Sequence, residues 1–196
     1  MMSDCGTHEL YIIIANISKR PNIRSMIASA SAFGADVLVV KQPKFSLDTH
    51  VPPNVPSSVN IRRFDTLRDC CDFVHSRGGA VIGVEIVDGA KNLDEDPFPF
   101  SGTCAVMMGN EGTGMSLQQK EQCDDFCYMS QHGGGTASLN VAVAAAIALH
   151  RFSLAREQPC GRGIRGMLPA LERRPEPMAR TDLGSGTERF TEAGEG

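Results

Sequence analysis

Short apolar runs alternate with helical patterns along most of the chain. Runs at 10–15, 36–40, 80–86, 104–108 and 126–129 predict buried strands, and residues 59–64 predict a further short strand. Helical patterns follow at 23–33, 66–76, 116–122 and 141–149. The strand, helix and strand over 10–40 imply a parallel pair with a right-handed crossover. The order of elements therefore predicts an α/β fold with a mainly parallel sheet.

The helix predicted at 141–149 is unusual because nearly every residue is Ala, Val, Ile or Leu. Such a helix is expected to be buried all round. Three consecutive glycines at 133–135 precede it, and Ser138 and Asn140 stand where it should begin. Free backbone N–H groups at such a helix start are able to meet a ligand.

A second glycine-rich stretch, MMGNEGTGMS at 107–116, follows a predicted strand. Gly109 and Gly114 have the spacing of a phosphate-binding P-loop, and Ser116 suits its Ser or Thr position, but Met115 stands where that loop requires Lys. A P-loop is therefore excluded, and no dinucleotide-binding glycine pattern is present. The glycines alone favour a plain strand-to-helix turn around Glu111.

The two stretches together are more specific. GNEGTG followed by GGGTASLNVAVA, in this order and spacing, resembles the second and third motifs of the SpoU, or TrmH-like, branch of the SPOUT RNA methyltransferases. The resemblance covers about residues 10–156. It implies an α/β domain with helices on both faces of a mainly parallel sheet and a deep trefoil knot at the C-terminal side. It also implies S-adenosylmethionine as cofactor, a homodimer, and methylation of the ribose 2′-hydroxyl of tRNA or rRNA.

The same resemblance assigns site residues at the ends of three segments. The expected cofactor-binding residues are Val84, Glu85, Ile86, Gly109, Asn110, Glu111, Gly112, Met129, Gln131, Ser138 and Leu139. The expected catalytic residues are Asn22, Glu111, Ser138 and Asn140, which match motif positions of the family, and Arg24, which is the candidate replacement for a family Arg that this chain lacks. Taken singly, Ser138 also suits a helix N-cap, Asn140 a hydrogen-bonded residue of the first helical turn, and Glu111 a charge near the positive end of the following helix. No metal site is expected, since the histidines show no zinc spacing.

The first motif of the family departs from the pattern here. In the family, an Asn near a helix start is followed six residues later by an Arg that helps to deprotonate the 2′-hydroxyl. Asn22 matches the Asn, but the residue six positions on is Ala28, which has no proton-handling group. Arg24 lies on the same helical face, one turn of about 5.4 Å away, but its side chain leans toward the N-terminus.

Three hypotheses follow. The chain is an active ribose methyltransferase in which Arg24, Lys19 or Arg20 takes over the proton transfer of the missing family Arg. Alternatively, it is a knotted protein that binds cofactor or RNA without catalysis. The third hypothesis is a small-ligand-binding α/β domain of another kind, for which the two motif matches would be accidental.

Composition refines this picture. The 196 residues carry a formal net charge of −4, although RNA affinity usually depends on Lys and Arg contacts to phosphates. Either the basic residues gather on one face, or an accessory protein helps to hold the RNA. Seven cysteines without a C-x-x-C pair suggest a reducing, intracellular compartment, with the cytoplasm expected, and no membrane span is expected.

The chain is expected to divide into two parts. Residues 1–156 form the predicted methyltransferase domain. Residues 157–196 are rich in glycine, proline and charge without a sustained apolar period, which predicts a disordered tail.

Overall fold

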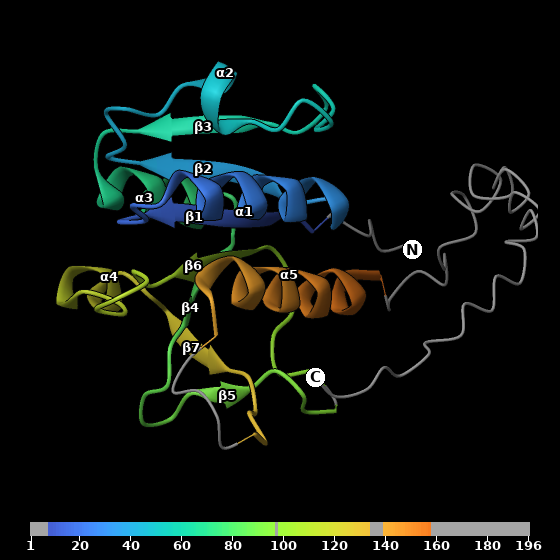
Figure 1. The fold of residues 1–196 in the computed structure, drawn as a ribbon. Helices are drawn as coiled ribbons and strands as arrows, with labels where there is room; N and C mark the ends of the chain where they lie inside the picture. The colour runs from blue at the N-terminus through green and yellow to red at the C-terminus, as the bar shows by residue number, and fades with distance from the viewer. Residues whose placement is uncertain (1–7, 97, 134–138, 158–196) are drawn as a thin grey trace, which may run out of the picture. The chain divides into compact units, whose positions relative to one another are not determined.

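The computed structural model describes residues 8–96, 98–133 and 139–157. Within these residues, seven strands form one sheet in the order β3-β2-β1-β6-β4-β7-β5 (Figure 1). All neighbouring strands pair in parallel. The strands are β1 (Leu10–Ala15), β2 (Asp36–Val40), β3 (Ile61–Phe64), β4 (Ala80–Val84), β5 (Lys91–Asn92), β6 (Cys104–Met108) and β7 (Asp125–Tyr128). The predicted mainly parallel sheet is confirmed. Strand β5 was not predicted, because two residues are too short to leave a periodic signal.

In the described part of the chain, five helices accompany the sheet: α1 (Arg20–Ala32), α2 (Leu47–His50), α3 (Leu67–Ser76), α4 (Leu117–Glu121) and α5 (Val141–Glu157). Helix α1 begins three residues earlier than predicted. Pro21 lies in its first turn, where the missing N–H of proline costs nothing. Helix α2 lies between β2 and β3, where the sequence showed no helical pattern.

Helices cover both faces of the sheet, as predicted. In β1, Leu10, Ile12 and Ile14 pack in one apolar cluster with residues of α1 and α5. The alternate residues of β1 pack in a second cluster with α3. Because successive side chains of a strand point to opposite faces, α1 and α5 lie on one face and α3 on the other. Figure 1 shows α1 and α5 on the same face.

Helix α5 is not buried all round, so that prediction is wrong for the single chain. Ala145, Ala148 and Leu149 are fully enclosed, but Val143 is 48% exposed and Ile147 39% exposed. These two residues are four apart and therefore share one helical face. An apolar sequence does not by itself determine what covers a helix. The predicted homodimer would cover this face and stays a prediction.

Several predictions fall outside the described residues. Residues 134–138, in the glycine-rich loop, and 158–196, in the predicted tail, are not described. The trefoil knot, the contacts of Ser138 and the disorder of the tail therefore stay predictions. None of the described helices is long and apolar enough to cross a membrane.

The described cysteines behave as small apolar side chains. All are free thiols. Burial raises the pKa of Cys104 to about 11, and burial followed by the nearby Asp125 raises that of Cys127 to about 12. Both thiols stay protonated and unreactive at neutral pH.

Candidate functional site

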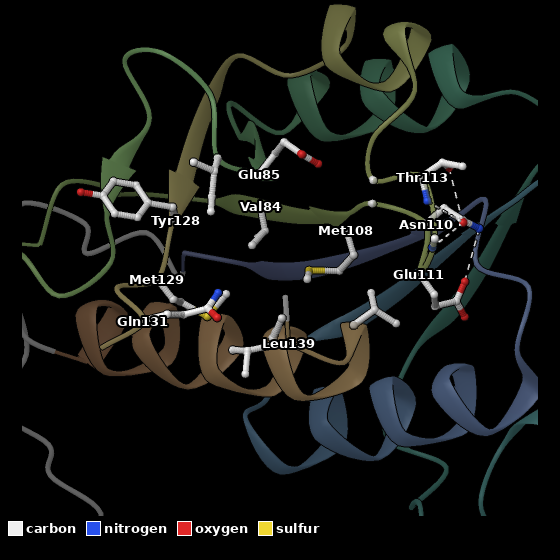
Figure 2. Close-up of a pocket in the computed structure, with 16 residues that line it drawn as sticks. Val84, Glu85, Met108, Asn110, Glu111, Thr113, Tyr128, Met129, Gln131 and Leu139 are labelled. Atoms are coloured by element: carbon white, nitrogen blue, oxygen red, sulfur yellow. Dashed lines mark hydrogen bonds between the residues drawn. The ribbon is translucent and has the colours of Figure 1, made fainter. Parts of the chain in front are cut away.

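A pocket of about 370 Å³ opens at the carboxyl edge of the sheet. This volume falls in the range of about 300–1,000 Å³ that is typical of small-molecule sites. Parallel strands point the same way, so the segments that follow β4, β6 and β7 all reach this edge and meet the start of α5. Val84 and Met108 face Leu139 across the pocket, with Asn110 and Glu111 at one end and Gln131 at the other (Figure 2).

Most of the predicted cofactor-binding residues line this pocket. They are Val84, Glu85, Ile86, Gly109, Asn110, Glu111, Gly112, Met129, Gln131 and Leu139. Ser138 lies outside the described residues. The lining also contains residues that sequence reasoning missed: Met108, Thr113, Gly114, Tyr128, Val141 and Ala144. All six lie close to predicted site residues in the sequence or on the first turns of α5. No motif marks them, so this closeness was the sequence signal that could have identified them.

The glycine turn after β6 is closed by its own main chain. Asn110 and Gly114 exchange two backbone hydrogen bonds of 2.9 and 3.0 Å. The Asn110 side-chain oxygen accepts a further bond of 2.9 Å from the Gly112 N–H. A Cβ atom at Gly109 would lie 2.7 Å from the Gly114 main chain, and Gly114 itself has φ of 68°. Side chains at Gly109 or Gly114 would therefore break the turn.

A carboxylate holds the far side of this turn. Glu85, just after β4, accepts a 3.0 Å hydrogen bond from the Met115 N–H. A Cβ at Gly114 would lie 3.1 Å from the Glu85 carboxylate. A side chain at position 114 would therefore also crowd the Glu85 carboxylate.

The charges of the pocket restrict its ligand. Glu85 and Glu111 contribute carboxylates, while none of the described lining residues is Lys, Arg or His. A phosphate-rich ligand would meet repulsion without a compensating cation. The lining instead suits a ligand that is neutral or carries positive charge, held largely by main-chain groups and apolar side chains.

Three motif residues form one hydrogen-bonded chain beside the pocket. The Asn22 side-chain amide donates to Glu111 at 2.8 Å, and its oxygen accepts from the Asn140 amide at 3.2 Å. Asn140 in turn accepts a 2.9 Å bond from the Ala142 N–H and so caps α5. The chain ties the glycine turn to the starts of α1 and α5.

Glu111 also caps α1. Its carboxylate accepts a 3.2 Å bond from the Lys19 N–H and a 3.4 Å bond from the Ser18 hydroxyl. Burial raises the pKa of Glu111, but the bonds from Asn22 and from nearby N–H groups outweigh burial, and the pKa is lowered overall. An ionised carboxylate with its lone pairs occupied positions its neighbours and is a poor proton acceptor.

The first-motif residues are only partly brought together. Asn22 is 8% exposed and belongs to the hydrogen-bonded chain described above. The Arg24 guanidinium donates to the Thr49 main-chain oxygen at 2.9 Å, and Arg24 does not line the pocket. Ala28 is half-buried on α1 and also does not line it. Neither Arg24 nor Ala28 thus lines the pocket, and the role of Arg24 in proton transfer stays a prediction.

The chain is thus an α/β protein with a pocket of small-molecule size at the carboxyl edge of a parallel sheet, the edge where such folds commonly bind ligands. The model of the SpoU rRNA Methylase family matches residues 9–150, and the chain belongs to this family. The resemblance in the two glycine-rich motifs is thereby confirmed.

Individual relatives are more distant. An uncharacterized tRNA/rRNA methyltransferase of Mycobacterium sp. (strain KMS) is 29% identical over an alignment of 155 residues, and the match covers 77% of this chain and 48% of that protein. The 23S rRNA (guanosine-2′-O-)-methyltransferase RlmB of Coxiella burnetii is 27% identical over 157 residues, covering 78% of this chain and 61% of that protein. The chain thus spans about half to three-fifths of the length of these relatives.

Solved structures share the fold. The SpoU methyltransferase AviRb from Streptomyces viridochromogenes, solved in complex with the cofactor AdoMet, is 24% identical to this chain. The match has a TM-score of 0.61 and covers 80% of this chain and 60% of that one.

Proposed function

We propose that this protein is an S-adenosylmethionine-dependent methyltransferase that acts on the ribose 2′-hydroxyl of tRNA or rRNA. One observation carries the proposal. The ends of the three segments that family resemblance assigns to the cofactor converge on a single pocket with carboxylates and no described cationic side chain. The family membership and the AdoMet complex of AviRb support the same cofactor.

The pocket suits this cofactor chemically. S-adenosylmethionine supplies a methyl group already activated on a positively charged sulfonium. Glu85 and Glu111 give the pocket a negative potential, which favours a cation. The apolar side chains of Val84, Met108 and Leu139 offer contact surface to an adenosine group.

We assign the motif residues mainly to positioning. Glu111, Asn22 and Asn140 hold the glycine turn and two helix starts in fixed relation, which keeps the pocket preorganised. Ser138 is proposed to contact cofactor or substrate. Arg24 is proposed as the substitute proton-handling group, which requires it to leave the Thr49 oxygen when RNA binds.

The 2′-hydroxyl is the proposed acceptor because the Coxiella relative is a guanosine-2′-O-methyltransferase. The second candidate function is a protein that binds cofactor or RNA without catalysis. Ala28 at the expected Arg position, together with the placement of Arg24 outside the pocket, favours this alternative.

Two experiments in sequence test the proposal. Titration calorimetry with S-adenosylmethionine and its demethylated product measures cofactor binding. A transfer assay with methyl-labelled cofactor and total tRNA and rRNA then measures catalysis. Binding together with transfer supports the enzyme, whereas binding without transfer supports the second candidate. Absence of cofactor binding contradicts both the pocket assignment and the enzyme.

A further inference from the structure

Charge is divided unevenly across the sheet. Residues 8–64, which contain β1, β2, β3, α1 and α2, carry seven Lys or Arg and three Asp or Glu. Residues 80–133, which contain β4 to β7, carry two Lys or Arg and nine Asp or Glu. The net charge of −4 therefore conceals one positive side and one negative side.

Five exposed cations of the positive side gather at the carboxyl edge of the sheet. They are Lys19, Arg20, Lys41, Lys44 and Arg63, here called the basic surface. Lys19 and Arg20 follow β1, Lys41 and Lys44 follow β2, and Arg63 lies in β3. Ala15, Val40 and Phe64 are register partners across these strands, so the three strands end at the same level.

Hydrogen bonds join the segments that carry these cations. The Gln42 amide donates to the Ile17 main-chain oxygen at 2.9 Å, which ties the segment after β2 to the segment after β1. The Arg63 guanidinium donates to the Gln42 main-chain oxygen at 3.4 Å. These bonds hold the segments after β1 and β2 and the end of β3 together, and one acid, Asp65, lies beside Lys41 and Arg63.

The charges of this surface are available to a partner. The ion pairs among the described residues involve Arg68, His75, Arg77 and Lys91, and none involves a member of the basic surface. Lys41 also has φ of 47°, a left-handed conformation that is uncommon for residues other than Gly, Asn and Asp. The chain thus carries an exposed lysine at a position where glycine would fit with less strain.

The basic surface begins where the pocket ends. The Asn110 side chain donates to the Asn16 main-chain oxygen at 2.8 Å, and Glu111 accepts from the Lys19 N–H at 3.2 Å. Asn110 and Glu111 line the pocket, whereas Asn16 and Lys19 lie in the segment that follows β1, and Lys19 is part of the basic surface. A polyanion lying on this surface would therefore reach the mouth of the pocket.

We propose that the phosphate backbone of the RNA substrate runs over the basic surface, from Arg63 past Lys41 and Lys44 to Lys19 and Arg20, and so brings a ribose to the pocket. This inference rests on the proposed function. The negative side formed by β4, β7 and β5 repels phosphates and leaves one direction of approach. Net negative charge is then compatible with RNA binding without an accessory protein.

The test compares two triple variants with the same change in charge. The first, Lys41→Gly, Lys44→Gln and Arg63→Gln, removes three cations from the basic surface and relieves the left-handed lysine. The control, Arg62→Gln, Arg68→Gln and Arg77→Gln, removes three cations near α3. Arg62 and Arg77 stack on Phe73 of that helix, and Arg68 pairs with Asp72. Thermal melting of both variants checks that they fold.

Fluorescence anisotropy with labelled total tRNA, over a series of KCl concentrations, gives the readout. The slope of log K against log salt is negative, and each lost phosphate contact reduces its magnitude by about 0.7–0.9. The first variant is expected to reduce the magnitude of this slope by about 2 and to weaken tRNA binding at least ~10-fold. The control is expected to keep the parent slope, and calorimetry is expected to show unchanged cofactor binding in both variants.

The outcomes separate this inference from the proposed function. If the parent methylates RNA while the first variant keeps the salt dependence of the parent, the proposed RNA path over the basic surface is contradicted and the proposed enzymatic function is supported. Equal losses in both triple variants likewise overturn the basic surface, since the effect is then one of total charge. If only the first variant loses tRNA binding and neither the parent nor the variants transfer methyl groups, the proposed RNA path is supported and the proposed enzymatic function is contradicted.

Discussion

Replacing Glu111 by Gln tests the claim that this residue positions the pocket. The carboxylate receives hydrogen bonds from Asn22 at 2.8 Å, from the Lys19 N–H at 3.2 Å and from the Ser18 hydroxyl at 3.4 Å. Gln keeps one accepting oxygen but places an NH₂ group where the second oxygen stood. That group cannot accept a bond, so at least one charge-assisted bond is lost.

The size of the effect follows from these contacts. Hydrogen bonds to charged groups contribute about 1.5–3 kcal/mol each, and the partial exposure of Glu111 reduces this to about 1–2 kcal/mol. For a chain of this size, that loss lowers Tm by about 2–8 °C at neutral pH. The matched control Glu121→Gln changes an exposed acid on α4 and is expected to stay within about 0.5 kcal/mol of the parent.

The pH dependence of stability gives a second check. Because the pKa of Glu111 is lowered in the folded protein, its stabilisation is present above its unfolded pKa and is lost as pH falls through the folded pKa. Thermal melting from neutral to acid pH should therefore show the gap between parent and Glu111→Gln closing in acid. Equal Tm values at neutral pH, or a gap that persists unchanged in acid, would refute the positioning role.

The remaining predictions concern the pocket, catalysis and assembly. Gly112→Val should weaken cofactor binding about 5–150-fold in calorimetry without lowering Tm, because a Cβ there meets only one protein atom within 4 Å, at 3.7 Å; unchanged binding would place the pocket elsewhere. Ala28→Arg should raise methyl transfer by about 10²–10⁴-fold, the usual contribution of an acid–base group; no gain would favour the binding-only protein. The parent should be a dimer by light scattering at micromolar concentration and Val143→Lys a monomer, whereas Leu117→Lys, at an 80% exposed site on α4, should leave assembly unchanged; a monomeric parent would exclude the dimer.

The centre of the sheet was predictable because strands β1, β2, β4 and β6 are largely buried on both faces. Continuous apolar runs such as residues 10–15 and 104–108 have few other structural solutions once helices alternate with them. The glycine turn was predictable for a similar reason, since Gly109 and Gly114 occupy positions where side chains would clash or strain the backbone. These features depend on local chemistry that the sequence displays directly.

Other features depend on contacts that the sequence does not display. The hydrogen bond from Asn22 to Glu111 joins residues 89 positions apart, and no periodic pattern in the sequence predicts it. The hydrogen bond that holds Arg24 at Thr49 is likewise set by the path of the segment after β2. The exposed face of α5 carries the same residue types as its buried face, so composition alone predicted burial for both.

One measurement tests the central claim most directly. The protein is incubated with methyl-labelled S-adenosylmethionine and total tRNA and rRNA, and the RNA is digested to nucleosides that are then separated. The proposed function predicts label in 2′-O-methylated nucleosides, at a rate that Ala28→Arg increases. Label confined to base-methylated nucleosides, or no label with either the parent or Ala28→Arg, would contradict it.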